Sequence, residues 1–269
     1  MNDEQRCRNE LVSGRIDDAL PRLKGIPVFS HNTAVLYWGS ETYDNDLDDH
    51  LVHISVDDRD RRPRLVGIHA HLWTAPLETS LEGGYEVVRP AVCWAQMAQY
   101  ATRETLIKIA SNFTCRDQKR RVASLDELAT YVKENKKFRG RSTLLEILPF
   151  LVEGTDSPEE GVLADFLIAN EFGRPVINYR VPLDDGDCYL DAAFPDLKLG
   201  FEYQGAYHSG VDQMRRDADK HNHLIKRGWK IVYVTANDFA TKQSRRALRD
   251  IIASAKAQQA CLMSLRAIL

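Results

Sequence analysis

The chain has 269 residues, of which 43% are hydrophobic and 28% are charged, and its formal net charge is -3. This length can bury a sizeable core and predicts two modest domains or one large one. The composition excludes a strongly basic or strongly acidic protein. It does not decide whether the chain binds nucleic acid, because local patches of charge matter more than the total.

The five cysteines are far apart, odd in number and include no CxxC pair. They predict reduced, packed thiols and neither a zinc site nor a disulfide framework. The opening residues MNDEQRCRNE are polar, without an apolar signal core, and no apolar run is long enough to span a bilayer. We therefore expect a cytoplasmic protein with no membrane partner and no small-molecule cofactor.

The first 150 residues mix helical and strand patterns. SHNTAVLYWG offers Ser30 as a helix N-cap and Gly39 as a stop. LVHISV (51–56) alternates like a strand, and LVGIHAHLW (65–73) resumes that pattern after a charged turn. From residue 91 to about 150 the pattern is helical and carries two basic runs, RDQKRR (116–121) and KENKKFRGR (133–141). These runs are either solvated helix ends or contacts to a nucleic-acid backbone. We predict a mixed α/β domain over residues 1–150, serving positioning or recognition.

Two histidines of this region invite a metal hypothesis. His69 and His71 are two residues apart on a predicted strand, so both rings lie on one face. A metal site needs further ligands, and no third ligand is apparent nearby in the sequence. We therefore expect both histidines to be structural.

Residues 151–269 predict a second α/β domain, which begins in the segment VEGTDSP. A helix at 158–172 precedes the strands VINYRV, CYLDAAF and LGFEYQG. A polar helix at about 212–227, the strand WKIVYVT and an amphipathic C-terminal helix complete the chain. This order is typical of a mixed sheet flanked by helices. We expect the chemistry here, because acidic residues interrupt two apolar strands.

The two acids lie in a predicted hairpin with the turn PDLK. If the strands pair through this turn, Phe194 faces Leu199 and Asp191 lies opposite Glu202, with Gln204 on the same face. Like charges in this position destabilise a hairpin, and a divalent cation bound by oxygen ligands converts the repulsion into a binding site. The alternatives are a cation from the protein itself or simple exposure of both acids to water.

Two flanking segments add further candidates. SPEE begins a helix with Ser157 at the N-cap and Glu160 three residues later, so Glu160 is either part of a capping box or a ligand. The polar helix downstream has either a merely solvated face or a basic face that suits a phosphate backbone approaching a metal ion. Its basic residues are Arg215, Arg216, Lys220, Lys226 and Arg227.

The ordered set "SPEEGVL", "YLDAAFPDLKLGFEYQGAYH" and "RRDADKHNHLIKRGWKIVYVTANDF" resembles the very-short-patch-repair-like endonuclease domains at the C-termini of many bacterial proteins. These domains are a branch of the PD-(D/E)xK nuclease superfamily. The resemblance covers about residues 155–239 and implies a restriction-endonuclease-like α/β fold. The N-terminal half, in SHNTAVLYWG and in VHISV with GIHAH, is similar to the regions that precede this domain in proteins related to antitoxin-type regulators.

The resemblance implies roles for individual positions. Asp191 and Glu202 match the metal-binding acids, and Glu160 matches an acid on the first core helix that can complete the metal site. Gln204 stands where many relatives have Lys or Asp, and an amide replaces neither the cation nor the ligand fully. His208 follows the motif at the spacing of this branch. The polar helix beside the site is matched by Arg216, Asp217 and Lys220.

The activity implied is Mg²⁺- or Mn²⁺-dependent hydrolysis of DNA phosphodiester bonds, in which a metal-bound water attacks phosphorus in line. A metal-bound water or His208 then protonates the leaving oxygen. The rival expectation is a catalytically inactive DNA-binding regulator or antitoxin-type protein that keeps the nuclease fold. Gln204 favours this rival, whereas the retained acids favour the enzyme. DNA is the expected partner through the resemblance, and a homodimer is left open.

Overall fold

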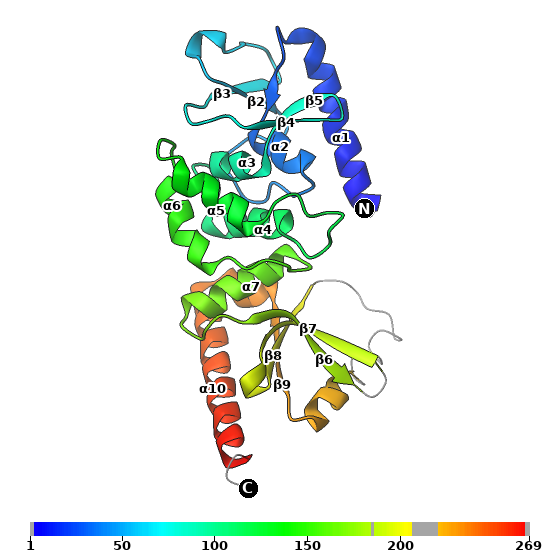
Figure 1. Cartoon of the computed structure of the whole chain (residues 1–269), viewed down its shortest axis with the longest axis vertical. Coiled ribbons are helices and arrows are strands. Elements are labelled where there is room, and N and C mark those ends of the chain that lie inside the picture. The colour runs from blue at the N-terminus through cyan, green and yellow to red at the C-terminus, as the bar shows by residue number, and fades with distance from the viewer. Residues whose placement is uncertain (1–2, 184–185, 206–219, 267–269) are drawn as a thin grey trace. The chain divides into compact units, whose positions relative to one another are not determined.

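The computed structural model describes residues 3–183, 186–205 and 220–266. Helices and strands alternate along the chain and build two mixed sheets flanked by helices, which confirms the expected α/β class (Figure 1). The chain divides into two compact units, Met1–Pro158 and Glu159–Leu269, so the division falls a little after the position 150/151 expected from the sequence.

The first unit begins with a helix and a sheet. Its sheet has the strand order β3-β2-β1-β5-β4, and β2 pairs with β3 in parallel. The helix α2 begins after Ser30, the predicted N-cap residue, and ends close to Gly39, which has a positive φ of 80°. The elements of this part are α1 (Asp3–Ala19), β1 (Val28–Phe29), α2 (His31–Tyr37), β2 (Val52–Val56), β3 (Ile68–Leu72), β4 (Thr79–Glu82) and β5 (Tyr85–Val88).

A helical part completes the first unit, as its sequence predicts. Its core contains large side chains that are fully buried, among them Trp94, Met97 and Phe113. Apolar positions repeat along α4 with the helical period, so one face packs inward. The helices are α3 (Pro90–Met97), α4 (Arg103–Phe113), α5 (Leu125–Glu134) and α6 (Arg141–Ile147).

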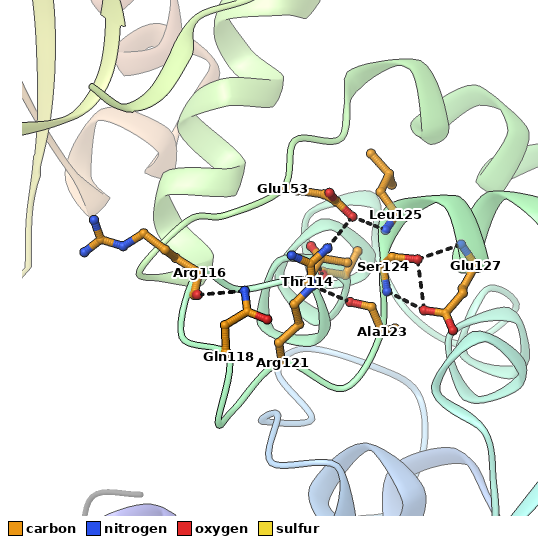
Figure 2. A network of polar contacts seen from close by, with 10 residues as sticks. Thr114, Arg116, Gln118, Arg121, Ala123, Ser124, Leu125, Glu127 and Glu153 are labelled. Carbon is orange, nitrogen blue, oxygen red and sulfur yellow. Dashed lines mark hydrogen bonds and ion pairs between the residues drawn. The ribbon is translucent and has the colours of Figure 1, made fainter. Parts of the chain in front are cut away.

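Two arginines of the first basic run, Arg116 and Arg121, form ion pairs within the first unit. Arg121 forms an ion pair of 2.9 Å with Glu153, and Glu153 also accepts a hydrogen bond from the backbone N–H of Leu125 (Figure 2). Arg116 contacts Asp156 at 2.6 Å through a two-pronged guanidinium contact. These cations therefore hold the segment after α6 in place, which is a structural use of a run that the sequence left open to nucleic-acid contact.

The second unit contains a four-stranded sheet with the order β6-β7-β8-β9 (Figure 1). Its first three strands are antiparallel neighbours, and β8 and β9 are parallel. Helical residues 220–226 precede β9. The elements are α7 (Pro158–Ala169), β6 (Val176–Leu183), β7 (Gly186–Phe194), β8 (Leu199–Gln204), β9 (Lys230–Thr235), α9 (Ala236–Ala240) and α10 (Lys242–Arg266).

The predicted hairpin register is confirmed, because Phe194 pairs with Leu199 across β7 and β8. The turn between them places Lys198 in the left-handed region, with a φ of 48°. The alternation of side chains sends the two faces of β8 to different partners. On one face, Tyr203 stacks on Phe239 of α9 at a centroid distance of 6.5 Å.

The other face of this sheet carries the helical residues 220–226. Leu224 of this segment is buried in one apolar cluster with Cys188 and Leu190 of β7. Gly200 of β8 leaves room for that cluster, since a Cβ at this position would lie 2.6 Å from Cδ1 of Leu190. Helices thus cover both faces of the sheet, and the acid-bearing face of β8 lies under residues 220–226.

None of the helices in the described part of the chain is both long and apolar enough to cross a membrane.

Candidate functional site

The two acids of the hairpin sit where the pairing of β7 and β8 ends. Its outermost pair is Ala192 with Phe201, and the next residues outward are Asp191 and Glu202. The carboxylate of Asp191 accepts a hydrogen bond of 2.6 Å from the backbone N–H of Tyr203, so the side chain reaches across to the neighbouring strand. This contact fixes one oxygen of Asp191 at the end of the hairpin.

Glu202 has a cationic partner from the adjacent helix. Nζ of Lys220 lies 2.6 Å from Oε1 of Glu202, and their side chains are 32% and 20% exposed. The same Nζ donates a hydrogen bond of 3.3 Å to the backbone carbonyl of Tyr189. Of the three compensations that the sequence allows for the acids, a cation from the protein is therefore present for Glu202.

Opposing effects act on the pKa of Lys220. Burial by itself lowers this pKa, but the negative charge of Glu202, with a smaller contribution from Asp191, outweighs burial and raises the pKa above its ordinary value. Lys220 is therefore an ammonium ion at neutral pH. It can supply positive charge and hydrogen bonds, but it cannot act as a general base.

Two further polar residues lie on this face of the sheet. Tyr233 of β9 is the register partner of Glu202, and its hydroxyl is 2.9 Å from Nδ1 of His221. Cys188 is buried below them, and this burial raises the pKa of its thiol. The carboxylates, the Lys220 ammonium, the Tyr233 phenol and the His221 imidazole thus lie above the buried apolar cluster that contains Cys188.

The remaining residues predicted for this site fall into three groups. Glu160 is 6% exposed on α7, whereas Gln204 is exposed at the end of β8. Lys226 is exposed on the helical segment, and the backbone carbonyl of Arg227 accepts a hydrogen bond from Lys198. The predicted residues His208, Arg215, Arg216 and Asp217 lie outside the described residues.

Three histidines of the first unit, and not the predicted acids, bring their metal-ligating atoms close together. Among the described residues, His53, His69 and His71 form the group whose ligand atoms all lie within 4.8 Å of one another. The three predicted ligands Glu160, Asp191 and Glu202 do not form such a group within the part of the chain that the structure describes.

The expectation that His69 and His71 lack a third ligand nearby is therefore wrong. His53 is the register partner of His69 in the parallel pair β2 and β3, so the two side chains share a face. Nδ1 of His53 lies 2.9 Å from Nε2 of His71. The sequence alone does not identify His53 as a ligand, because parallel pairing places it beside His69, 16 positions later. No local pattern indicates that pairing.

A fourth histidine covers the cluster from α2. His31 is fully buried and stacks on His71 with a centroid distance of 3.6 Å. Its backbone N–H donates to Gln96, and its Nδ1 lies 2.9 Å from the Ser30 hydroxyl. Burial first, and then the neighbouring histidines, lower the pKa of His31 well below its ordinary value.

The same causes act on His71, where burial and the nearby His69 and His53 lower the pKa to about 3. Burial also lowers the pKa of His53, although the Asp48 carbonyl opposes the shift. His53 and His71 are therefore neutral at physiological pH, with a nitrogen lone pair available on each ring.

Comparison of the chain with family models, with curated proteins and with solved structures found no match. The family hypothesis for the second unit therefore rests on the motifs of the sequence and on the geometry of the hairpin.

Proposed function

We propose that the second unit is a metal-dependent DNA endonuclease that hydrolyses phosphodiester bonds at the end of the β7–β8 hairpin. The observation that carries this proposal is that Asp191 and Glu202 both follow the last pair of the β7–β8 hairpin, with Asp191 bonded to the backbone of Tyr203 and Lys220 2.6 Å from Glu202. Two carboxylates at the end of one hairpin are costly to hold near each other, so their placement favours a site for a cation and an anionic substrate over accident.

The donor set fits a hard divalent cation. Asp191 and Glu202 both end in a carboxylate, and a carboxylate offers two oxygens with about four lone-pair sites. Asp191 and Glu202 would hold the ion, and carboxylate oxygens select Mg²⁺ or Mn²⁺ over softer metals. When bound, such an ion lowers the pKa of its water and neutralises charge on the phosphate.

Lys220 supplies the positive charge that a lysine in place of Gln204 would provide. In the resembling family, many relatives carry a lysine at the position of Gln204, and here the ammonium comes from the helical segment instead, 2.6 Å from Glu202. A protonated lysine at this point can orient a phosphate oxygen and stabilise the charge that develops in the transition state. The substitution at Gln204 therefore does not by itself argue against catalysis.

One observation favours the rival function, a DNA-binding protein without catalysis. The ammonium of Lys220 already offsets the charge of Glu202, so the hairpin has a compensation that needs no metal ion. In this case the basic residues of the helical segment would bind the DNA backbone alone.

Cleavage of supercoiled plasmid separates the two functions. The proteins are the wild type, Asp191→Asn, Lys220→Met and the control Lys230→Met, each with Mg²⁺, Mn²⁺ or EDTA. Lys230 bonds Gln258 at 2.6 Å and lies at the start of β9, so its loss leaves the acids untouched.

If the second unit is an endonuclease, the wild type and Lys230→Met should nick the plasmid when a metal ion is present. The nicking rate of Asp191→Asn and of Lys220→Met should be lower by roughly a hundredfold or more. If no protein cuts but all of them bind DNA, the catalytic proposal is wrong and the binding protein is supported.

A further inference from the structure

The histidine cluster of the first unit has a geometry that suits a transition metal. We propose that His53, His69 and His71 bind a Zn²⁺ ion whose open coordination position takes a phosphate group from an adjoining cationic cleft. This site lies on the first unit, and it does not depend on the activity proposed for the second.

The distances within the cluster support zinc. Nδ1 of His53 and Nε2 of His71 are 2.9 Å apart, and ligand atoms of all three histidines fall within 4.8 Å of one another. Nitrogens bound tetrahedrally to zinc at 2.0–2.1 Å lie about 3.3 Å apart. To reach this spacing, the His53–His71 contact opens by a few tenths of an ångström, and a pair near the 4.8 Å limit closes by about 1.5 Å.

The hydrogen-bond partners of His53 and His71 can hold the tautomers that a metal site requires. Nε2 of His53 faces the carbonyl of Asp48 at 2.9 Å, and a carbonyl can only accept, so the proton sits on Nε2 and Nδ1 carries the lone pair. Nδ1 of His71 lies 3.3 Å from the hydroxyl of Tyr100. In the metal-free protein the 2.9 Å contact needs a donor, so Nε2–H of His71 donates to Nδ1 of His53. When zinc takes the place of that proton, His71 carries its proton on Nδ1, from which the Tyr100 hydroxyl can accept, and Nε2 of His71 becomes the second ligand atom. Such outer partners orient the histidines of metal sites.

Three imidazoles select the metal and leave a position open. Imidazole nitrogens favour zinc and its neighbours over Mg²⁺ or Ca²⁺. Zinc sites with three protein ligands keep a fourth position for water or substrate, whereas structural zinc sites have four. His53 and His71 are buried and His69 is exposed, so solvent reaches the cluster from the side of His69.

A cleft of about 470 Å³ opens on this exposed side, and its lining includes both His69 and His71. The described residues that line it include no acidic side chain and four cationic ones, namely Arg59, Arg62, Lys137 and Arg139. This volume is in the range of small-molecule sites. Guanidinium groups match the oxygens of a phosphate, so the charge of the cleft favours a phosphate as the group that reaches the metal.

Zinc binding is measured by titration calorimetry on the full chain without a polyhistidine tag. The variants are His69→Ala, which removes the exposed ligand, and the matched control His50→Ala, which removes an exposed histidine outside the cluster. We expect a single Zn²⁺ per chain in the wild type and in His50→Ala, and an affinity lower by roughly tenfold or more in His69→Ala.

Circular dichroism is used to check that both variants are folded before the titration. Equal zinc affinity in the wild type and in His69→Ala would overturn the proposal. Co²⁺ provides a second readout, since a tetrahedral nitrogen site produces strong visible absorption that an octahedral aqueous ion lacks.

The open position is tested on the Co²⁺ protein with inorganic phosphate and with adenosine monophosphate. A change in the visible spectrum with either compound supports phosphate binding at the metal. The compound that binds more tightly shows whether the ligand is free phosphate or a phosphomonoester. Arg62→Gln is expected to weaken this effect several-fold and to leave Co²⁺ affinity unchanged. If neither compound changes the spectrum, the assignment of a phosphate ligand is wrong.

Discussion

Lys220 places its Nζ 2.6 Å from the carboxylate of Glu202, between the helical residues 220–226 and strand β8. This contact explains how an apolar strand tolerates an acid on a face covered by a helix. In the endonuclease that we propose, the same ammonium would also supply positive charge beside the acids. Structure and catalysis would therefore share one ion pair, and their contributions can be separated.

Removal of the lysine tests the structural part. Lys220→Met leaves Glu202 without its cation in a position that is 20% exposed, so we expect a loss of about 1–3 kcal/mol in the free energy of unfolding. Urea denaturation measures this loss. The double variant Lys220→Met with Glu202→Gln should recover most of it, because no carboxylate then lacks a partner. Equal stability of Lys220→Met and of the double variant would contradict the explanation that the loss comes from the unpaired charge of Glu202.

A metal ion should compensate for the missing lysine. If Asp191 and Glu202 bind Mg²⁺, the ion stabilises the folded state, and the gain is larger in Lys220→Met than in the wild type because the ion no longer competes with an ammonium. Thermal unfolding with and without Mg²⁺ measures the difference. Asp191→Asn should abolish it, and persistence of the gain in that variant would place the ion elsewhere.

Zinc removal should destabilise the first unit. A ligand at a hundred times its Kd stabilises the folded state by about 2.7 kcal/mol, so Zn²⁺ should raise the Tm of a thermal transition and a chelator should lower it. The wild type and His50→Ala should show the shift, and His69→Ala should lose most of it. A shift of equal size in all three proteins would point to zinc bound outside the cluster.

A buried phenol predicts a loss of stability at alkaline pH. Tyr131 donates a hydrogen bond of 2.7 Å to the carbonyl of Pro76, and burial raises the pKa of Tyr131 to about 12. The unfolded chain releases this proton near pH 10, so the stabilisation is intact below pH 10 and is lost as the pH rises to about 12.

Tyr131→Phe should reduce the slope of stability against pH in that window by up to about 1.4 kcal/mol per pH unit. Urea midpoints from pH 9 to about 11.5 measure the slope for both proteins, and equal slopes would show that this phenol ionises alike in the folded and unfolded chains.

Two glycines with the same backbone conformation should differ in their tolerance of alanine. Gly140 and Gly154 have φ values of 79° and 78°. A Cβ on Gly140 would lie 2.6 Å from the backbone of Ala98, whereas a Cβ on Gly154 would meet no atom of the described residues within 4 Å. We expect Gly154→Ala to cost about 1 kcal/mol from backbone strain and Gly140→Ala about 3 kcal/mol or more. Urea unfolding compares them, and equal losses would argue against the close approach to Ala98.

Local patterns in the sequence predicted the hairpin of the second unit well. Alternation along LGFEYQG and the turn PDLK determine the pairing of Phe194 with Leu199, because a hairpin joins neighbouring segments through a short turn. The helix after Ser30, the strands β2 and β3 of the first unit and the four strands of the second unit also follow from local periodicity.

The tertiary structure decided which partners the functional side chains meet. The pairing of His53 with His69 is parallel and non-local, and the stacking of His31 on His71 depends on how α2 packs over the sheet. The contact of Lys220 with Glu202 likewise depends on how the helical segment lies across β8. Side-chain periodicity is a property of a segment, whereas such contacts arise from packing between distant segments. The sequence by itself therefore determined the elements and the positions of the acids, and only the fold brought together the histidine cluster and the cation beside the acids.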